Sequence, residues 1–303
     1  DYDFAVIGGG SGGYAGARTA VGLGLKTVVI EGGPDVGGLC ILRGCMPSKT
    51  LLESARRFRV LKRAGEFGLS CESPGFKTSA IIDRKKRLIG EFADYRRGQL
   101  ESGRFDFLRG RAEFLDPKTL RVHHLDGKIS TLSAKTFLIA TGSEIATPAV
   151  PGLAESSCLT SDDLLDLENL PQSIIVLGAG PVGLEMASYC RAFGSRVAIV
   201  QRSPHILKSV DADVSKSLEE ALRHDGIEIH TGTALHRVDD NGHCARVSFE
   251  QNGELKHLEA ARVLNALGRK PRLDGLENLS LNLTHGRISV QPDQSTSQPH
   301  IFA

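Results

Sequence analysis

Short apolar runs alternate with amphipathic stretches at the start of the chain. Residues 3–8 form one such run, and an alanine-rich helical stretch follows to about Gly24. A second predicted strand at 26–30, apolar over its last three residues, ends at Glu31. Continuous apolar runs of this length are typical of strands in a parallel sheet that is covered on both faces. The pattern therefore predicts a strand–helix–strand unit.

The same order returns in the second half of the chain. An apolar run at 174–177 precedes a helical stretch, and another apolar run follows at 196–200. Two prolines and a glycine within 148–152 predict a linker before this second unit. The second unit is predicted to end near 266–269, after which the chain returns to the first domain. The predicted domains are residues 1–149, 150–268 and 269–303.

The segment between the two units has a different pattern. A long helical stretch starts near Cys45, and a polar, charged helix is predicted over 77–103. Alternating residues with frequent turn signals over 105–137 predict a small antiparallel meander, followed by a strand at 137–140.

Glycines with a defined spacing follow the first strand of each unit. Gly8, Gly10 and Gly13 form Gly-x-Gly-x-x-Gly, and Glu31 stands 18 residues after the last of them. Such a turn lets backbone amides at a helix N-terminus approach a pyrophosphate, while the acid binds a ribose. The same spacing recurs in the second unit at Gly178, Gly180 and Gly183.

Two fingerprints predict two dinucleotide cofactors, one of which passes electrons to the other. The predicted fold class is α/β, with two Rossmann-like dinucleotide-binding domains, the second inserted in the first, and a small antiparallel meander.

Two of the six cysteines, Cys40 and Cys45, lie just beyond the first fingerprint. A structural disulfide between them would close a tiny loop and constrain little of the unfolded chain. A metal site would need further Cys or His ligands at matching spacing, and none is present. Redox use is the interpretation that remains, and no metal is expected. The other four cysteines are interpreted as ordinary thiols in a reducing compartment.

Composition excludes some classes of partner. The net charge of the 303 residues is +1, so no attraction to nucleic acid or anionic membrane is expected. No stretch approaches the ~20 apolar residues that span a bilayer, and no secretory signal pattern is present. A cytoplasmic protein is expected. The cationic positions Arg84–Arg87, Arg96 and Arg97 are interpreted as a solvated helix face, with a phosphate-binding patch as the alternative.

The chain resembles the pyridine nucleotide–disulfide oxidoreductases, which include glutathione reductase, dihydrolipoyl dehydrogenase and mercuric reductase. The likeness rests on the two fingerprints and on the redox segment that ends in Pro47-Ser48-Lys49. It also rests on Ala140-Thr141-Gly142, Gly268-Arg269 and the run Thr296–Ala303.

The resemblance implies that FAD lies in the first domain, with its pyrophosphate at the first fingerprint and a ribose on Glu31. Cys45 is then the thiol against the flavin, and Cys40 the thiol that exchanges with a small-molecule disulfide substrate. Lys49 resembles the lysine beside the flavin, with Glu185 as its ion-pair partner. Further implied cofactor-binding residues are Ser11, Gly38, Ala112, Thr141, Gly142, Gly268 and Arg269.

Three residues bear on the nicotinamide cofactor. Gln201 stands where NAD-specific members carry an acid that holds the ribose diol. Arg202 and Lys208 match two basic positions of the glutathione-reductase-like branch, and cations attract a 2′-phosphate. NADPH is therefore expected in preference to NADH.

Two departures from the family pattern stand out. Pro181 occupies a position where relatives carry a bulkier side chain near the nicotinamide. The chain ends at Ala303, where relatives continue into a flavin-binding Gly-Asp and an interface domain that supplies an acid/base pair across a homodimer. His300 is read as a turn residue. We therefore expect a fragment that is nearly inactive by itself, and a homodimer for the full-length protein.

The leading hypothesis is an NADPH-dependent flavoprotein disulfide reductase. Arg18 stands where glutathione reductase has a substrate-carboxylate arginine, whereas Pro47-Ser48-Lys49 is the version of the lipoamide and mercuric branches. An NAD-dependent dihydrolipoyl dehydrogenase and a mercuric reductase-like enzyme remain alternatives. A non-catalytic FAD-binding fragment is the alternative from another functional class.

Overall fold

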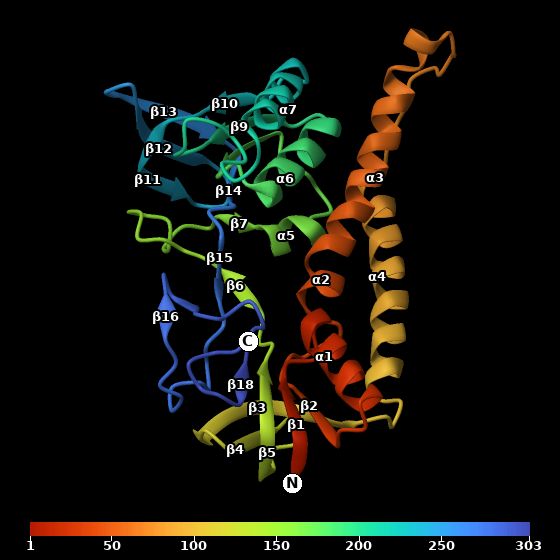
Figure 1. Cartoon of the computed structure of the whole chain (residues 1–303). Coiled ribbons are helices and arrows are strands. Elements are labelled where there is room, and N and C mark those ends of the chain that lie inside the picture. The colour runs from red at the N-terminus through yellow and green to blue at the C-terminus, as the bar shows by residue number, and fades with distance from the viewer. The chain divides into compact units, whose positions relative to one another are not determined.

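The computed structural model describes all residues from 1 to 303 as two compact units (Figure 1). The chain leaves the first unit after Glu144 and re-enters it at Arg269, so most of the second unit is an insertion in the first. Unit 1 comprises residues 1–46, 88–144 and 269–303, and unit 2 comprises 47–87 and 145–268. The structure groups residues 47–87, which the sequence analysis assigns to the first domain, with unit 2.

Unit 1 is built on a six-stranded sheet of order β1-β2-β3-β4-β5-β18, in which β1 also pairs with β5. All pairings except those of β4 are parallel. The strands are β1 (Tyr2–Ile7), β2 (Thr27–Glu31), β3 (Asp106–Asp116), β4 (Thr119–His124), β5 (Ile129–Ile139) and β18 (Ile301–Phe302).

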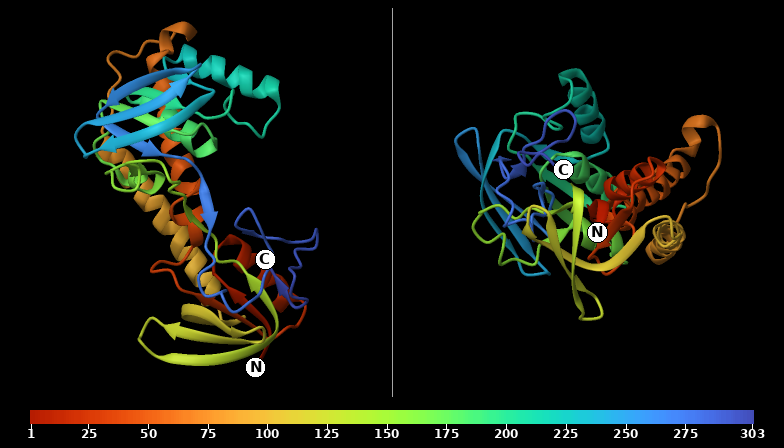
Figure 2. Two further views of the ribbon diagram at one scale, coloured as in Figure 1. Left: turned by 90° about the vertical axis from the view of Figure 1, so that its left-hand side faces the viewer. Right: turned by 60° about the horizontal axis from the view of Figure 1, so that its bottom comes forward.

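Strands β3 and β5 each serve two parts of this sheet. The first residues of β3 pair with β2, and from Gly110 onward β3 pairs with β4. The start of β5 closes the antiparallel meander with β4, and its end runs parallel to β1 (Figure 2). The strand expected separately at 137–140 is therefore the end of β5, because one continuous strand passes from the meander into the parallel sheet.

Helix α1 (Ser11–Gly22) packs on this sheet through its small residues. Ala17 is fully buried and Ala20 is nearly so. A Cβ at Gly16 would lie 2.5 Å from the side chain of Leu138, so the helix can approach the sheet only with glycine there. Helix α4 (Thr78–Leu100) closes this side of the core at Leu100.

Unit 2 contains a parallel five-stranded sheet of order β10-β9-β8-β14-β7. Its central strand β8 is buried at every residue, as the continuous apolar run predicts. The strands are β7 (Leu159–Thr160), β8 (Ser173–Leu177), β9 (Arg196–Val200), β10 (Glu228–His230) and β14 (Arg262–Asn265). The helices are α5 (Ser161–Asp166), α6 (Pro181–Ala192) and α7 (Ala212–His224).

A separate antiparallel sheet completes unit 2 and is seen in blue near the top of the left-hand view in Figure 2. It consists of β11 (Thr233–Asp240), β12 (Ala245–Gln251) and β13 (Glu254–Ala260). The remaining short elements are α2 (Gly38–Leu42), the single 3₁₀ turn η1 (Ala64–Phe67), β6 (Ser143–Ile145), β15 (Arg269–Pro271), β16 (Leu283–Thr284) and β17 (Arg287–Ile288). No helix combines the length and the apolar character needed to cross a membrane.

Helix α3 (Cys45–Lys62) docks on α6, which explains why residues 47–87 group with unit 2. Arg59 donates to the carbonyl of Ser188 at 3.0 Å, and Lys62 donates to the carbonyl of Ala192 at 3.3 Å. Cations are favourable at the carbonyl end of a helix. The ring of Phe58 stacks on that of Phe193 with 5.4 Å between centroids.

The expectation of a wholly solvated cationic face on α4 is wrong at two positions. Lys85 is only 5% exposed and forms an ion pair with Asp166. The guanidinium of Arg96 lies over the ring of Tyr14, with Nε and Nη1 enclosed. The reason is helical periodicity, because both residues fall in the stripe that faces the core. The apolar members of this stripe are Ile82, Ile89, Ala93 and Leu100.

Candidate functional site

The first glycine turn brings the end of β1, the start of α1 and the end of β5 into close backbone contact. Gly8 has φ +108°, and a Cβ there would lie 2.3 Å from the carbonyl oxygen of Ala140. A Cβ at Gly13 would lie 1.8 Å from the carbonyl oxygen of Gly8. The helix cap at Gly10 has no side-chain hydrogen bond, so the first amides of α1 have no capping side chain. The turn thus fits an anionic pyrophosphate.

Glu31 holds the loops on either side of this turn. Its carboxylate accepts hydrogen bonds from the backbone amides of Gly9 at 2.8 Å and Gly33 at 2.6 Å. The carboxylate therefore lies beside the turn at the carboxyl end of β2, where the ribose of a bound dinucleotide is expected. Ala112 lies farther along β3, half-buried, with its carbonyl oxygen 2.4 Å from the position of a Cβ on Gly275.

The segment that carries the two cysteines packs against the first glycine turn through Gly38. Gly38 has φ +67°, and a Cβ on it would lie 2.5 Å from the Cα of Gly10. Cys40 lies in α2 and Cys45 begins α3, with a side-chain hydrogen bond between them. The structure shows both as thiols, with Cys40 half-buried and Cys45 exposed.

The pKa of the Cys40 thiol is raised above its ordinary value. Burial is the largest cause, and the hydrogen bond and the charge of Cys45 act in the same direction. The backbone amide of Cys45 and the hydroxyl of Ser11 act in the opposite direction, because hydrogen bonds to the sulfur favour the thiolate. Ser11, the first residue of α1, therefore touches both the pyrophosphate turn and the dithiol.

Lys49 and Glu185 form an ion pair within unit 2. The distance from Nζ of Lys49 to Oε1 of Glu185 is 2.6 Å. Lys49 lies one turn after the start of α3, and Glu185 lies in the first half of α6. The docking of α3 on α6 thus brings together two residues that are 136 positions apart.

The second glycine turn repeats the geometry of the first. Gly178 has φ +99°, and a Cβ on it would lie 2.6 Å from the carbonyl oxygen of Ala266. A Cβ on Gly183 would lie 2.1 Å from the carbonyl oxygen of Gly178. Gly180 caps α6, and Pro181 occupies the first helical position, which suits proline.

Gln201 takes in this second turn the place that Glu31 takes in the first. Its Oε1 accepts a hydrogen bond from the amide of Ala179 at 2.9 Å. The carbonyl of Ala179 in turn accepts from the amide of Leu207 at 3.0 Å. Two hydrogen bonds therefore tie the glycine turn to the loop that carries Arg202 and Lys208. Both cations are exposed, and neither forms an ion pair in the structure.

The remaining predicted residues lie at the chain crossing between the units. The hydroxyl of Thr141 donates to the carbonyl of Arg272 at 2.6 Å. Arg269 donates from Nε to the hydroxyl of Ser143 and from Nη2 to its carbonyl, at 2.9 and 2.7 Å. Gly142 and Gly268 both have positive φ, at +77° and +120°. These hydrogen bonds join two segments of unit 1, residues 141–143 and 269–272.

Sequence reasoning missed two contacts near these sites. It did not foresee that Gln201 accepts a hydrogen bond from the amide of Ala179, because this bond joins the loops that follow two neighbouring strands, β8 and β9. It also assigned Arg96 to solvent. The spacing of Arg96 from Ala93 and Leu100 places it on their helix face, and this signal could have been read from the sequence.

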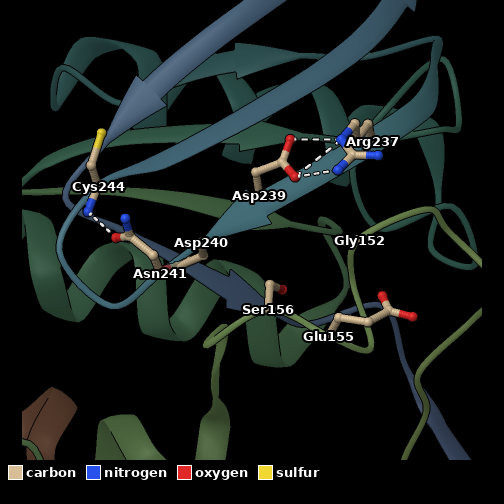
Figure 3. A pocket seen from close by; sticks show the side chains of 8 residues that line it. All are labelled: Gly152, Glu155, Ser156, Arg237, Asp239, Asp240, Asn241 and Cys244. Atoms are coloured by element: carbon tan, nitrogen blue, oxygen red, sulfur yellow. Dashed lines mark hydrogen bonds and ion pairs between the residues drawn. The ribbon is translucent and has the colours of Figure 1, made fainter.

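A surface cavity of about 500 Å³ in unit 2 contains none of the predicted residues (Figure 3). Its most polar groups already have partners. Arg237 pairs with Asp239 at 2.8 Å, and the buried carboxylate of Asp240 accepts from the amides of Gly242 and Val263. No group of three or more His, Cys, Asp or Glu side chains is arranged to hold a metal ion. The lining residues are Gly152, Glu155, Ser156, Arg237, Asp239, Asp240, Asn241 and Cys244.

Known proteins resemble the chain over its whole length. A mercuric reductase from Lysinibacillus sphaericus is 34% identical over 100% of the chain, which spans 55% of that protein. A dihydrolipoyl dehydrogenase from Bacillus subtilis (strain 168) is 33% identical over 100% of the chain, which spans 66% of that protein. The chain thus covers between about half and two thirds of the length of these relatives.

A solved structure and a family model agree with these relatives. The "HOCl-induced flavoprotein disulfide reductase RclA from Escherichia coli" superposes with a TM-score of 0.83 at 26% identity, over 99% of this chain and 65% of the other. The family model described as "Pyridine nucleotide-disulphide oxidoreductase" matches residues 2–303. With both glycine turns and the dithiol in place, the chain belongs to the pyridine nucleotide-disulphide oxidoreductase family.

Proposed function

We propose that this protein is an FAD-dependent oxidoreductase that passes electrons from NADPH to the Cys40–Cys45 pair and on to a disulfide substrate. The observation that carries the proposal is the position of the dithiol. Cys40 and Cys45 are hydrogen-bonded to each other, and the segment that holds them packs on Gly10 through Gly38. A dithiol against a pyrophosphate turn is suited to electron exchange with the cofactor bound there.

The first turn fits the diphosphate of FAD by its shape and charge. Gly8 and Gly13 leave no room for side chains, and the amides of α1 present positive partial charge. Glu31 supplies an acceptor for a ribose. When bound, FAD supplies the two-electron relay between the nicotinamide and the dithiol.

The chain's own residues account for the exchange with substrate. The thiolate of Cys40 attacks one sulfur of the substrate, forming a mixed disulfide and expelling the other sulfur as a thiolate that takes up a proton. Cys45 then attacks the sulfur of Cys40, which releases the second thiol and leaves a Cys40–Cys45 disulfide. The Ser11 hydroxyl and the Cys45 amide stabilise the attacking thiolate of Cys40, against the effect of burial.

The full-length gene product, purified and reconstituted with FAD, tests the reaction directly. We expect NADPH to bleach the flavin and to support turnover of a disulfide, with oxidised glutathione and lipoamide as the first substrates. The relatives give reason to include lipoamide and Hg(II), as the names dihydrolipoyl dehydrogenase and mercuric reductase indicate. A flavin that dithionite bleaches and NADPH does not would contradict the proposal and favour a cofactor-binding module without hydride access.

We propose NADPH as the electron donor because of the residues next to the second glycine turn, where the ribose of the nicotinamide cofactor is expected. Gln201 is neutral, so no carboxylate there repels a 2′-phosphate, and Arg202 and Lys208 have no acid partner. We expect Arg202→Ala to raise the Michaelis constant for NADPH by roughly tenfold or more, the effect of losing one charge-assisted hydrogen bond. The Michaelis constant for NADH should change little, and steady-state kinetics with both cofactors measures the difference.

Arg196→Ala is the matched control for this experiment. Arg196 is also exposed, but it begins β9, whereas Arg202 follows the end of that strand. The control should leave both Michaelis constants unchanged. Equal efficiency of NADPH and NADH in the unmodified protein would refute the cofactor assignment and favour the dihydrolipoyl dehydrogenase alternative.

A further inference from the structure

Arg96 is a cation of α4 to which the proposed function gives no role. Its guanidinium lies over the ring of Tyr14, with 3.9 Å between Cζ and the ring centroid. Nε and Nη1 are enclosed and meet no acceptor, although the side chain as a whole is only half-buried. The next residue, Arg97, pairs with Asp94 at 2.8 Å, but no carboxylate pairs with Arg96. A partly enclosed guanidinium without an acceptor is unfavourable unless an anion completes its environment.

One face of α4 places Arg96 beside the redox segment. Ile89 and Ala93 pack with Ile41, the residue that follows Cys40. Arg96 lies three residues after Ala93, and residues three apart share a helix face. The rise between them is only about 4.5 Å. Arg96 therefore lies one turn of α4 beyond Ala93, which packs against the segment that carries Cys40.

A second line of contacts leads to the same place from α1. The hydroxyl of Ser11 is hydrogen-bonded to Cys40. Tyr14 lies three residues later in α1, so it shares a helix face with Ser11. Arg96 rests on the ring of Tyr14. Both helices thus converge on one region of unit 1 that holds the exchange thiol and an unpaired positive charge.

We propose that the guanidinium of Arg96, held on the ring of Tyr14, binds a carboxylate of the disulfide substrate that reacts at Cys40. This inference rests on the proposed reductase function and names its substrate class, disulfides that carry a carboxylate. A guanidinium binds a carboxylate through a planar fork, and stacking on an aromatic ring holds that fork in one orientation. Arg96 is a binding residue here and takes no part in the bond changes.

Two alkylating reagents test the anion site without any turnover. Iodoacetate and iodoacetamide react with the same thiols but differ in one negative charge. In the reduced protein, the ratio of their rates at Cys40, followed by mass spectrometry of the peptide containing it, reports local attraction of anions. We expect Arg96→Gln to lower the iodoacetate-to-iodoacetamide ratio several-fold, and Arg96→Lys to restore part of it.

Arg97→Gln is the matched control, since it removes the same charge from the same helix at an exposed position. We expect it to leave the ratio unchanged. In the holoenzyme, lipoate and lipoamide form the corresponding substrate pair. Arg96→Gln should raise the Michaelis constant for lipoate roughly tenfold or more and leave that for lipoamide unchanged.

Three results would overturn the proposal. The first is an alkylation ratio that is unchanged in Arg96→Gln, or that falls equally in Arg97→Gln. The second is weaker FAD binding by Arg96→Gln in a fluorescence titration, which would assign the guanidinium to the cofactor's diphosphate. The third is a lowered ratio in a protein that reduces neither lipoate, lipoamide nor oxidised glutathione, which would keep an anion site and reject both the disulfide substrate and the proposed function.

Discussion

Replacing Cys45 with serine is expected to abolish disulfide reduction, with a loss on the order of 10³-fold or more, as for other catalytic nucleophiles. Cys40→Ser should have the same effect. The reason is stoichiometric, because a single thiol can form a mixed disulfide but cannot resolve it within the segment. Turnover of lipoamide or oxidised glutathione with NADPH measures the loss.

The two variants also separate the roles of the thiols. NADPH-dependent reduction of ferricyanide by the flavin does not need the dithiol, so it should survive in both variants. After reduction, a long-wavelength absorbance band marks a thiolate against oxidised flavin. Cys40→Ser should keep this band and Cys45→Ser should lose it. The opposite pattern would reverse the assignment, and it is a real alternative because Cys45 is the more exposed thiol in the structure.

Cys158→Ser is the control for these variants. Cys158 is half-buried like Cys40, but it lies in unit 2, with its sulfur 3.0 Å from the hydroxyl of Ser156. Its substitution should leave disulfide reduction and the absorbance band intact. Equal loss of activity in Cys158→Ser would show that damage to a half-buried thiol, rather than loss of the redox pair, explains the result.

Gly13→Ala is expected to destabilise unit 1 by about 1–3 kcal/mol or more and to yield protein with little bound flavin. The added Cβ would lie 1.8 Å from the carbonyl oxygen of Gly8. The Gly8 atoms that the Cβ would meet belong to the backbone and cannot rotate away, so the clash can be relieved only by moving α1 away from β1. That movement would also shift the helix amides that are expected to meet the diphosphate. Chemical denaturation and the flavin content of the purified protein measure the two effects.

Gly12→Ala is the matched control, one residue earlier in the same helix. A Cβ at Gly12 has no atom within 4 Å, and its φ is not positive. Alanine there should leave flavin content unchanged and stabilise the helix by up to about 1 kcal/mol. If Gly13→Ala bound flavin and unfolded like Gly12→Ala, the close helix–strand contact would not be a requirement of the site.

The two dinucleotide folds could be predicted from the sequence because their signals are local. Positions 8 and 178 require glycine because the backbone has a positive φ there, within the turn itself. The apolar runs at 3–8 and 174–177 report strands buried on both faces, which a neighbouring helix then covers. The family resemblance added the pairing of Lys49 with Glu185, which the ion pair at 2.6 Å supports.

Local signals were less informative in the charged helix. The sequence shows Lys85 and Arg96 as two more cations in a polar stretch, yet one is buried against Asp166 and the other lies on Tyr14. Their partners come from α5 and α1, which are distant in the chain. Charge alone predicts solvation, and only the packing of the other elements decides which positions of a helix are covered.

The sequence by itself determined where the chain turns, where its buried strands lie and which two thiols are close neighbours along the chain. These properties depend on backbone conformation and on spacing over a few residues. Tertiary structure decided which groups share an environment. It placed Ser11 on Cys40, Gln201 on the amide of Ala179, and residues 47–87 with unit 2 through the docking of α3 on α6. Hydrogen bonds and burial join residues far apart in the chain, so they follow from the folded arrangement as a whole rather than from any local segment.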